Sequence, residues 1–242
     1  NVLLVIGATA VLVPLVATAP AIKKDLVMML AATVLMGGLM VMGEIGRIAG
    51  FGMIAILAAY VFFQYRMAMA GDVPPDAEDE AGEAEFVKPI YAYGFLLLGL
   101  AAIALGAEFL VRGAKESAGI IGVPEAVVAL SVIALGTSLP ELSTCIIAGR
   151  RGHSDIVLGN IIGSNVFNIL MILGVTAIMK PISVAASAPQ LVDFDIYVVG
   201  ASSLLFAGMV FAFGKITRPV GIVFCAAYLV YNVYIYAMYI GA

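Results

Sequence analysis

The sequence predicts an all-α, polytopic membrane protein, and three observations lead to that class. Of its 242 residues, 63% are hydrophobic and only 12% are charged, whereas a soluble domain is roughly 45–50% apolar and about 25% charged. The mean hydropathy is +1.13. The apolar residues also form runs that are too long and continuous for barrel strands. This composition excludes an ordinary soluble enzyme, a disordered chain and a basic nucleic-acid-binding protein.

About eight membrane-spanning helices follow from these runs, because a helix needs about 20 predominantly apolar residues to cross the hydrocarbon. In chain order the predicted spans are Asn1–Leu15, Leu26–Met42, Phe51–Tyr65, Ile90–Val111, Ala126–Ala148, Ile156–Met179, Ile196–Phe213 and Val220–Ile240. Charged residues and helix breakers occupy the joints. We therefore expect an integral membrane protein.

The orientation follows from the placement of lysine and arginine. With eight spans, eight of these cations fall on one side and four on the other, which predicts that the richer side is cytoplasmic. The same side holds Gly71–Glu85, a segment with seven acidic residues and no basic one. We interpret residues 71–88 as a solvated cytoplasmic linker. A role in attracting cations is the alternative.

The chain resembles itself. Asn1–Leu15 aligns with Asn168–Ile182, sharing Asn, Leu, Gly, Thr, Ala and Pro in register, and the match continues through pairs such as Gly43 with Gly214 and Tyr60 with Tyr231. Because the first span matches the sixth, five crossings later, the two copies must face opposite sides. Inverted repeats are typical of secondary transporters. Residues 1–70 are then the remainder of a first repeat and 89–242 a second repeat. The parent protein would have 5+5 helices, and this chain would begin inside the third.

The chemistry concentrates in the segment Ala134-Leu-Gly-Thr-Ser-Leu-Pro-Glu141. Pro140 offers no amide hydrogen to the Gly136 carbonyl, so we expect a discontinuous helix with free carbonyl oxygens at membrane depth. Helical spacing places Ala134, Thr137, Ser138 and Glu141 on one face. A carboxylate, hydroxyls and carbonyls suit calcium or sodium rather than zinc or copper. Because an ionisable group inside a span is costly, Glu141 is the principal candidate ligand.

The next span contains a small, polar stripe of Asn160, Gly163, Ser164 and Asn168. Close helix packing explains Gly163 and Asn168 equally well, but the amide oxygen of Asn160 is a neutral cation ligand that could face Glu141. Asp155 is expected to cap this helix.

Other polar residues have simpler explanations. Glu108 is expected to pair with Arg112 four residues later. Cys145 and Cys225 lie in apolar stretches, as small core residues do. The lone His153 and the absence of a His-Glu-x-x-His motif argue against an intramembrane enzyme.

Two motifs together, Gly136-Thr-Ser-Leu-Pro-Glu141 and Gly159-Asn-Ile-Ile-Gly-Ser-Asn165, resemble the halves of the α-repeat in the cation/calcium antiporter superfamily. The resemblance is nearest to prokaryotic sodium/calcium exchangers, and it places the α-repeat at about 122–182. It implies that Glu141 is one of two central calcium-binding glutamates and that the Thr137 carbonyl is a further ligand. It also implies that Ser138 and the Ala134 carbonyl contribute to a sodium site, and that Asn160 takes the midplane position. Some exchangers carry Asp where this chain has Asn160, which leaves the charge there open, and the partner glutamate would precede Asn1.

The resulting hypothesis is a secondary active transporter that exchanges Ca²⁺ for Na⁺ by alternating access, with ions bound at the midplane. A Ca²⁺/H⁺ antiporter, in which the same carboxylates exchange protons, is the alternative, and the serine at position 138 favours sodium. A membrane bundle without transport activity is a third possibility. No cofactor is expected beyond the transported ions, and the sequence leaves the oligomeric state open.

Overall fold

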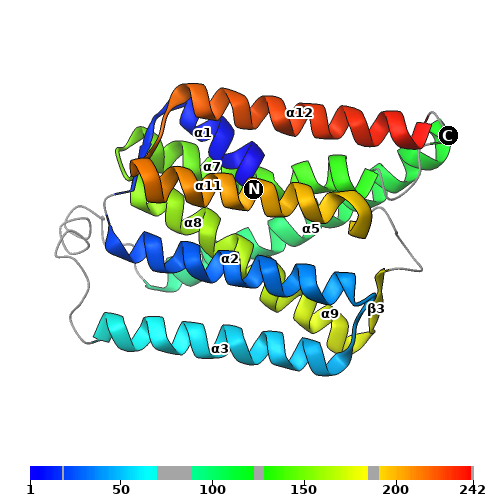
Figure 1. Cartoon of the computed structure of the whole chain (residues 1–242), viewed down its shortest axis with the longest axis horizontal. Coiled ribbons are helices and arrows are strands. Elements are labelled where there is room, and N and C mark those ends of the chain that lie inside the picture. Colours follow the sequence, from blue (N-terminus) through cyan, green and yellow to red (C-terminus); the bar gives the residue numbers. More distant parts are fainter. Residues whose placement is uncertain (18, 70–88, 123–127, 185–190, 241–242) are drawn as a thin grey trace. The chain divides into compact units, whose positions relative to one another are not determined.

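Helices make up almost all of the structure (Figure 1). It is a computed structural model that describes residues 1–17, 19–69, 89–122, 128–184 and 191–240. The α-helices are α1 (Gly7–Leu12), α2 (Pro20–Val41), α3 (Arg47–Met69), α5 (Pro89–Ile121), α7 (Ala134–Arg150), α8 (Ser154–Phe167), α9 (Gly174–Met179), α11 (Ile196–Phe213) and α12 (Arg218–Ile240). The described π-helical segments are Val2–Ile6, Ala129–Ile133, Asn168–Leu173 and Leu191–Asp195.

Six described helical segments are long and apolar enough to cross a membrane. They are Pro20–Val41, Arg47–Met69, Ser131–Arg150, Ser154–Met179, Val192–Phe213 and Arg218–Met238. The predicted first span is a shorter apolar helix, Val2–Leu12, and the predicted span Ile90–Val111 lies within α5. The predicted all-α, polytopic membrane class is confirmed. The acidic segment 71–88 lies outside the described residues.

Two compact units can be distinguished. The first contains Asn1–Tyr60 and Ser138–Tyr231, and the second contains Val61–Thr137 and Asn232–Ala242. In the second unit, the side chain of Leu110 on α5 lies against Gly136 at the start of α7. Ser131 and Tyr236 also share a hydrogen bond of 3.0 Å between their hydroxyl oxygens. The remaining description of the fold concerns the first unit.

Four two-residue strands connect the helices at the ends of the first unit. They are β1 (Leu15–Val16), β2 (Glu44–Ile45), β3 (Ile182–Ser183) and β4 (Lys215–Ile216). β1 pairs with β4 and β2 with β3, both antiparallel. Since α2 leads from β1 to β2 and α11 leads from β3 to β4, these two helices run in opposite directions, side by side (Figure 1).

The two halves of this arrangement repeat in detail. The Ala17 amide donates to the Gly214 carbonyl at 2.8 Å, and the Val184 amide donates to the Gly43 carbonyl at 2.9 Å. Gly43 and Gly214 both have positive φ, 88° and 63°, a conformation that glycine adopts without steric cost. These glycines end α2 and α11 and turn the chain into β2 and β4.

A tyrosine–aspartate pair also occurs in each half. Tyr60 on α3 donates to Asp25 Oδ1 on α2 at 2.7 Å. Tyr231 on α12 donates to Asp195 Oδ1, the residue before α11, at 3.0 Å. Each bond joins the two long helices of one half, and interhelical bonds of this kind contribute about 0.6–2 kcal/mol each in membrane proteins.

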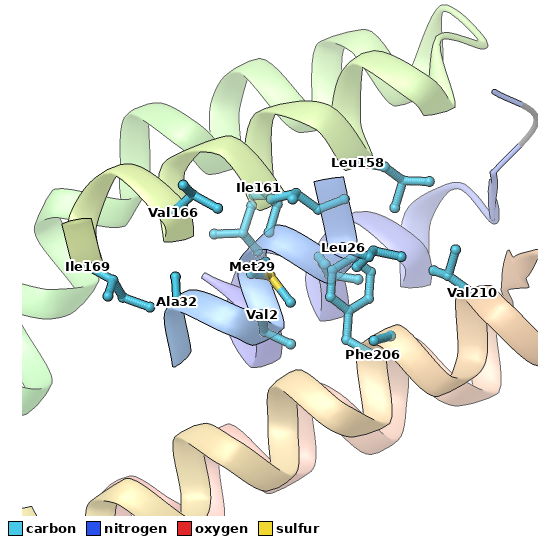
Figure 2. Packing of buried hydrophobic residues seen from close by; sticks show 14 of the residues in the cluster. Val2, Leu26, Met29, Ala32, Leu158, Ile161, Val166, Ile169, Phe206 and Val210 are labelled. Atoms are coloured by element: carbon cyan, nitrogen blue, oxygen red, sulfur yellow. The ribbon is translucent and has the colours of Figure 1, made fainter. Parts of the chain in front are cut away.

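The core of the first unit lies between α2, α8, α11 and the N-terminal helix (Figure 2). Leu26 and Met29 on α2 face Leu158 and Ile161 on α8, and Phe206 on α11 closes the cluster. All five side chains are fully buried. Large apolar side chains on the outward faces of α3 and α12, such as Phe51 and Val230, are more than half exposed, which suits lipid contact.

Candidate cation site

α7 carries most of the predicted site residues, and its backbone differs from the prediction. The expected break between Gly136 and Pro140 is absent, because α7 continues from Ala134 to Arg150 with Pro140 inside it. The irregular backbone is the π-helical segment Ala129–Ile133, which precedes Ala134. Thr144 Oγ1 donates to the carbonyl oxygens of Pro140 and Glu141, at 3.1 and 2.9 Å. Neither carbonyl is that of Gly136, the group that loses its backbone partner at Pro140.

Two predicted ligands, Ala134 and Thr137, lie in the second unit. The Thr137 hydroxyl donates to the Ala134 carbonyl at 3.1 Å. The structure thus places these two side by side, in the one-turn relation that the spacing predicted.

Ser138 and Glu141 lie in the first unit, one turn apart on α7. Ser138 donates to Asn1 Oδ1 at 3.1 Å, and Asn1 Nδ2 donates to Ser164 Oγ on α8 at 2.9 Å. Asn1 therefore bridges the two motif-bearing helices. Sequence analysis did not assign Asn1 or Ser164 to the site, although Ser164 lies in the polar stripe of α8 and Asn1 is the first residue of the repeat match.

Glu141 has the most unusual environment of the predicted residues. Its Oε2 atom is buried, and no described residue forms a hydrogen bond with it. A buried polar atom without a partner costs about 1–3 kcal/mol, and more when it is charged. A bound cation would compensate that cost, since a carboxylate oxygen is a preferred ligand of calcium.

Asn160 reaches α7 through a different residue from the one expected. Its Nδ2 atom donates to Thr144 Oγ1 at 3.2 Å, and Thr144 in turn bonds the backbone carbonyl of Glu141. The amide oxygen of Asn160, which is the predicted ligand atom, takes no part in this bond. Asn160 therefore lies against α7 within one turn of Glu141.

Three further sequence predictions have clear outcomes. Glu108 and Arg112 form the predicted i,i+4 ion pair on the exposed face of α5. Cys145 is buried, Cys225 is half-buried, and neither forms a disulfide. Asp155 lies in the first turn of α8, at the predicted helix start, but α8 has no side-chain cap bond at its N-cap residue. Asp155 Oδ1 instead accepts from the amide of Ala19, the residue before α2, so it ties the starts of two helices together.

The donor atoms of the site are oxygens of hydroxyl, amide, carbonyl and carboxylate groups. Among the described residues, no three His, Cys, Asp or Glu side chains come together as a metal-binding group. A site with one carboxylate and several neutral oxygens suits a hard cation that exchanges with solvent.

Comparison with known proteins agrees with this chemistry. The sequence model of the family described as "Sodium/calcium exchanger protein" matches residues 91–237. The chain belongs to the sodium/calcium exchanger family. Membership confirms the predicted superfamily, and it confirms a transporter rather than an enzyme.

Several relatives show how far the similarity extends. A putative antiporter, CaxA, from Alkalimonas amylolytica is 36% identical over 90% of this chain and 68% of its own length. The sodium/calcium exchanger MaX1 from Methanosarcina acetivorans is 35% identical over 65% of this chain and 43% of its own length. A solved structure of the sodium-calcium exchanger NCX_Mj, soaked with Na⁺ and Ca²⁺, superimposes with a TM-score of 0.67 at 26% identity, covering 95% of this chain and 70% of the other. The matches thus span about two fifths to about two thirds of these relatives.

The buried carboxylate oxygen leads to a stability prediction. Glu141→Gln removes the charge while keeping the shape, so in cation-free buffer we expect the free energy of unfolding to rise by about 1–3 kcal/mol. Thermal unfolding in detergent measures the change. Glu108→Gln, at an exposed ion pair on α5, is the matched control and should change stability little. A less stable Glu141→Gln protein would contradict the assignment of an uncompensated charge.

Proposed function

We propose that the protein exchanges Ca²⁺ for Na⁺ across the membrane by alternating access, with Glu141 as a central ligand. One observation carries the proposal: a carboxylate oxygen in a membrane-spanning helix is buried and lacks a partner among the described residues. Charged groups at such positions typically mark ion pathways. Relatives described as sodium/calcium exchangers support the choice of ions.

The candidate neutral ligands occur in both units. In the first, Ser138, Asn1 and Ser164 form a chain of hydrogen bonds from α7 to α8, with Asn160 held against Thr144 nearby. In the second, Thr137 and the Ala134 carbonyl supply oxygens one turn earlier on α7. We propose that Glu141, Thr137, Ser138, Ala134 and Asn160 are ligands, joined by Asn1 and Ser164.

Competition between the two ions would supply the coupling. A Ca²⁺ ion needs the carboxylate together with several neutral oxygens, whereas Na⁺ ions occupy the hydroxyl and carbonyl positions beside it. Because the two occupancies share oxygens, each ion disfavours the other. A high concentration of one ion on one side of the membrane therefore lowers the fraction of sites on that side that hold the other ion.

Transport in proteoliposomes tests the proposed coupling. With the full-length protein, we expect an outward-directed Na⁺ gradient to drive Ca²⁺ uptake, and a pH gradient alone to drive none. Glu141→Gln should abolish the flux because it removes the only charged ligand proposed here, whereas Glu108→Gln should preserve it. Ca²⁺ uptake driven by pH and indifferent to Na⁺ would instead establish the Ca²⁺/H⁺ alternative.

The role of Ser138 can be separated from that of Glu141. Ser138→Ala removes one neutral oxygen near the carboxylate, so we expect the half-saturating Na⁺ concentration to rise about tenfold, equivalent to one lost ligand bond of about 1.4 kcal/mol. Ser143→Ala is the matched control, since the Ser143 hydroxyl is exposed and bonds only the Leu139 carbonyl of its own helix. Equal Na⁺ dependence of the two variants would remove Ser138 from the sodium site.

We also propose that residues 1–70 and 89–242 are inverted repeats joined by the acidic segment 71–88 on the cytoplasmic side of a prokaryotic inner membrane. In support, α2 and α11 run in opposite directions between cross-paired strands.

Cysteine labelling tests this topology. On a background in which Cys145 and Cys225 are replaced by Ala, a membrane-impermeant maleimide should label Glu44→Cys in intact spheroplasts. It should label Asp79→Cys only after the membrane is opened. The opposite pattern would invert the proposed orientation, and labelling of both sites in intact spheroplasts would contradict it.

A further inference from the structure

Two pairs of glycines bring helices of opposite repeats into backbone contact. A Cβ atom built on Gly221 of α12 would lie 2.7 Å from the Gly7 carbonyl oxygen and 2.8 Å from the Val11 amide nitrogen of α1. A Cβ atom on Gly50 of α3 would lie 2.6 Å from the Gly174 carbonyl oxygen and 2.9 Å from Ile178 Cγ1 of α9. We call Gly7–Gly221 and Gly50–Gly174 the two glycine contacts.

The two glycine contacts are related by the repeat match, and each joins a glycine of one repeat to a glycine of the other. Gly7 aligns with Gly174, and Gly50 aligns with Gly221, in the repeat match. Thus α12 of the second repeat packs on α1 of the first, and α3 of the first repeat packs on α9 of the second. All four glycines are buried. By contrast, Gly52, only two residues from Gly50 on α3, is exposed and has open space around it.

Each contact lies where a π-helical segment passes into an α-helix. Gly7 and Gly174 are the first residues of α1 and α9, directly after the π-helical segments Val2–Ile6 and Asn168–Leu173. The first of these segments begins beside Asn1, whose side chain holds Ser138 and Ser164 together. Because only the segment Val2–Ile6 separates Gly7 from Asn1, a shift of α1 against α12 would displace the Asn1 side chain.

We propose that Gly50 and Gly221 are positioning residues for the cation site. Each sets how closely the terminal helix of one repeat, α3 or α12, packs against a helix of the other repeat that leads to the site, α9 or α1. This inference rests on the proposed function for its transport readout. Glycine is required because the nearest contacted atoms, the carbonyl oxygens of Gly7 and Gly174, are backbone atoms, which cannot rotate away as a side chain can. Close backbone approach at small residues is a general way to fix helix pairs in membranes.

Alanine at either position tests the proposal in the full-length protein. Gly221→Ala forces α1 away and displaces Asn1, so we expect the half-saturating Ca²⁺ concentration for exchange to rise about tenfold. The rise in unfolding temperature produced by Ca²⁺ should also be smaller than in the wild type. Gly50→Ala should act in the same direction through α9. Gly52→Ala is the matched control and should resemble the wild type in both measurements.

A second variant tests whether the contact stays closed during transport, by comparing its oxidised and reduced forms. A Cβ atom at Gly7 would lie 2.9 Å from Cys225 Sγ, so Gly7→Cys on a Cys145→Ala background should form a disulfide with Cys225 on oxidation. Because a positioning contact stays closed throughout transport, we expect exchange by the oxidised protein within about twofold of the reduced protein. Loss of exchange on oxidation and its return on reduction would show that the contact opens, which overturns the proposal.

The outcomes separate this inference from the proposed function. If the wild type shows no Na⁺-driven Ca²⁺ flux but Gly221→Ala and Gly50→Ala still reduce the Ca²⁺-induced stabilisation relative to Gly52→Ala, the exchange function fails and the positioning role stands. If the wild type exchanges and all three alanine variants match it, the positioning role fails and the function stands.

Discussion

The burial of one carboxylate constrains the rest of the site. Glu141 lies in a helix that is apolar enough to span a membrane, and its Oε2 atom has no partner among the described residues. A charge in that position is costly unless something neutralises it. The neighbouring groups are hydroxyls, an amide and carbonyls rather than lysine or arginine, so they do not neutralise it permanently. The site therefore retains a charge that an arriving cation can satisfy, which is what a carrier needs and what a purely structural ion pair would remove.

The surrounding fold keeps this arrangement in place through contacts between the two halves. Strands of two residues are far too short to be stable alone, so the β1–β4 and β2–β3 pairs depend on the helices that they join. The Tyr60–Asp25 and Tyr231–Asp195 bonds hold the long helices within each half. The strands and the buried glycines then link one half to the other at both ends. The short helix α1 of one half packs against α12 of the other, and α9 packs against α3.

Sequence reasoning recovered the helices well, because the length of an apolar run and the charges at its ends determine where a span begins and ends. The Glu108–Arg112 pair was also predictable, since it depends only on spacing along one helix. The prediction failed where neighbouring side chains decide the outcome. The break expected at Pro140 is absent, since α7 continues through it from Ala134 to Arg150. Asp155 accepts a bond from Ala19, 136 positions away in the chain, and the link from Ser138 through Asn1 to Ser164 likewise depends on tertiary contacts.

Charge balance indicates what else the site needs. A Ca²⁺ ion beside one carboxylate keeps a net charge of +1, whereas one Na⁺ beside the same group is neutral. In a medium of low dielectric constant, an uncompensated charge is expensive, so a site with Glu141 alone would favour Na⁺ strongly over Ca²⁺. Exchange requires comparable affinities for both, and a second carboxylate restores them by neutralising Ca²⁺ fully and leaving room for more than one Na⁺. The neutral Asn160 does not supply that charge. The proposed inverted repeat would offer a physical source for it, since a motif equivalent to the one at 136–141 in the other repeat would bring a second carboxylate.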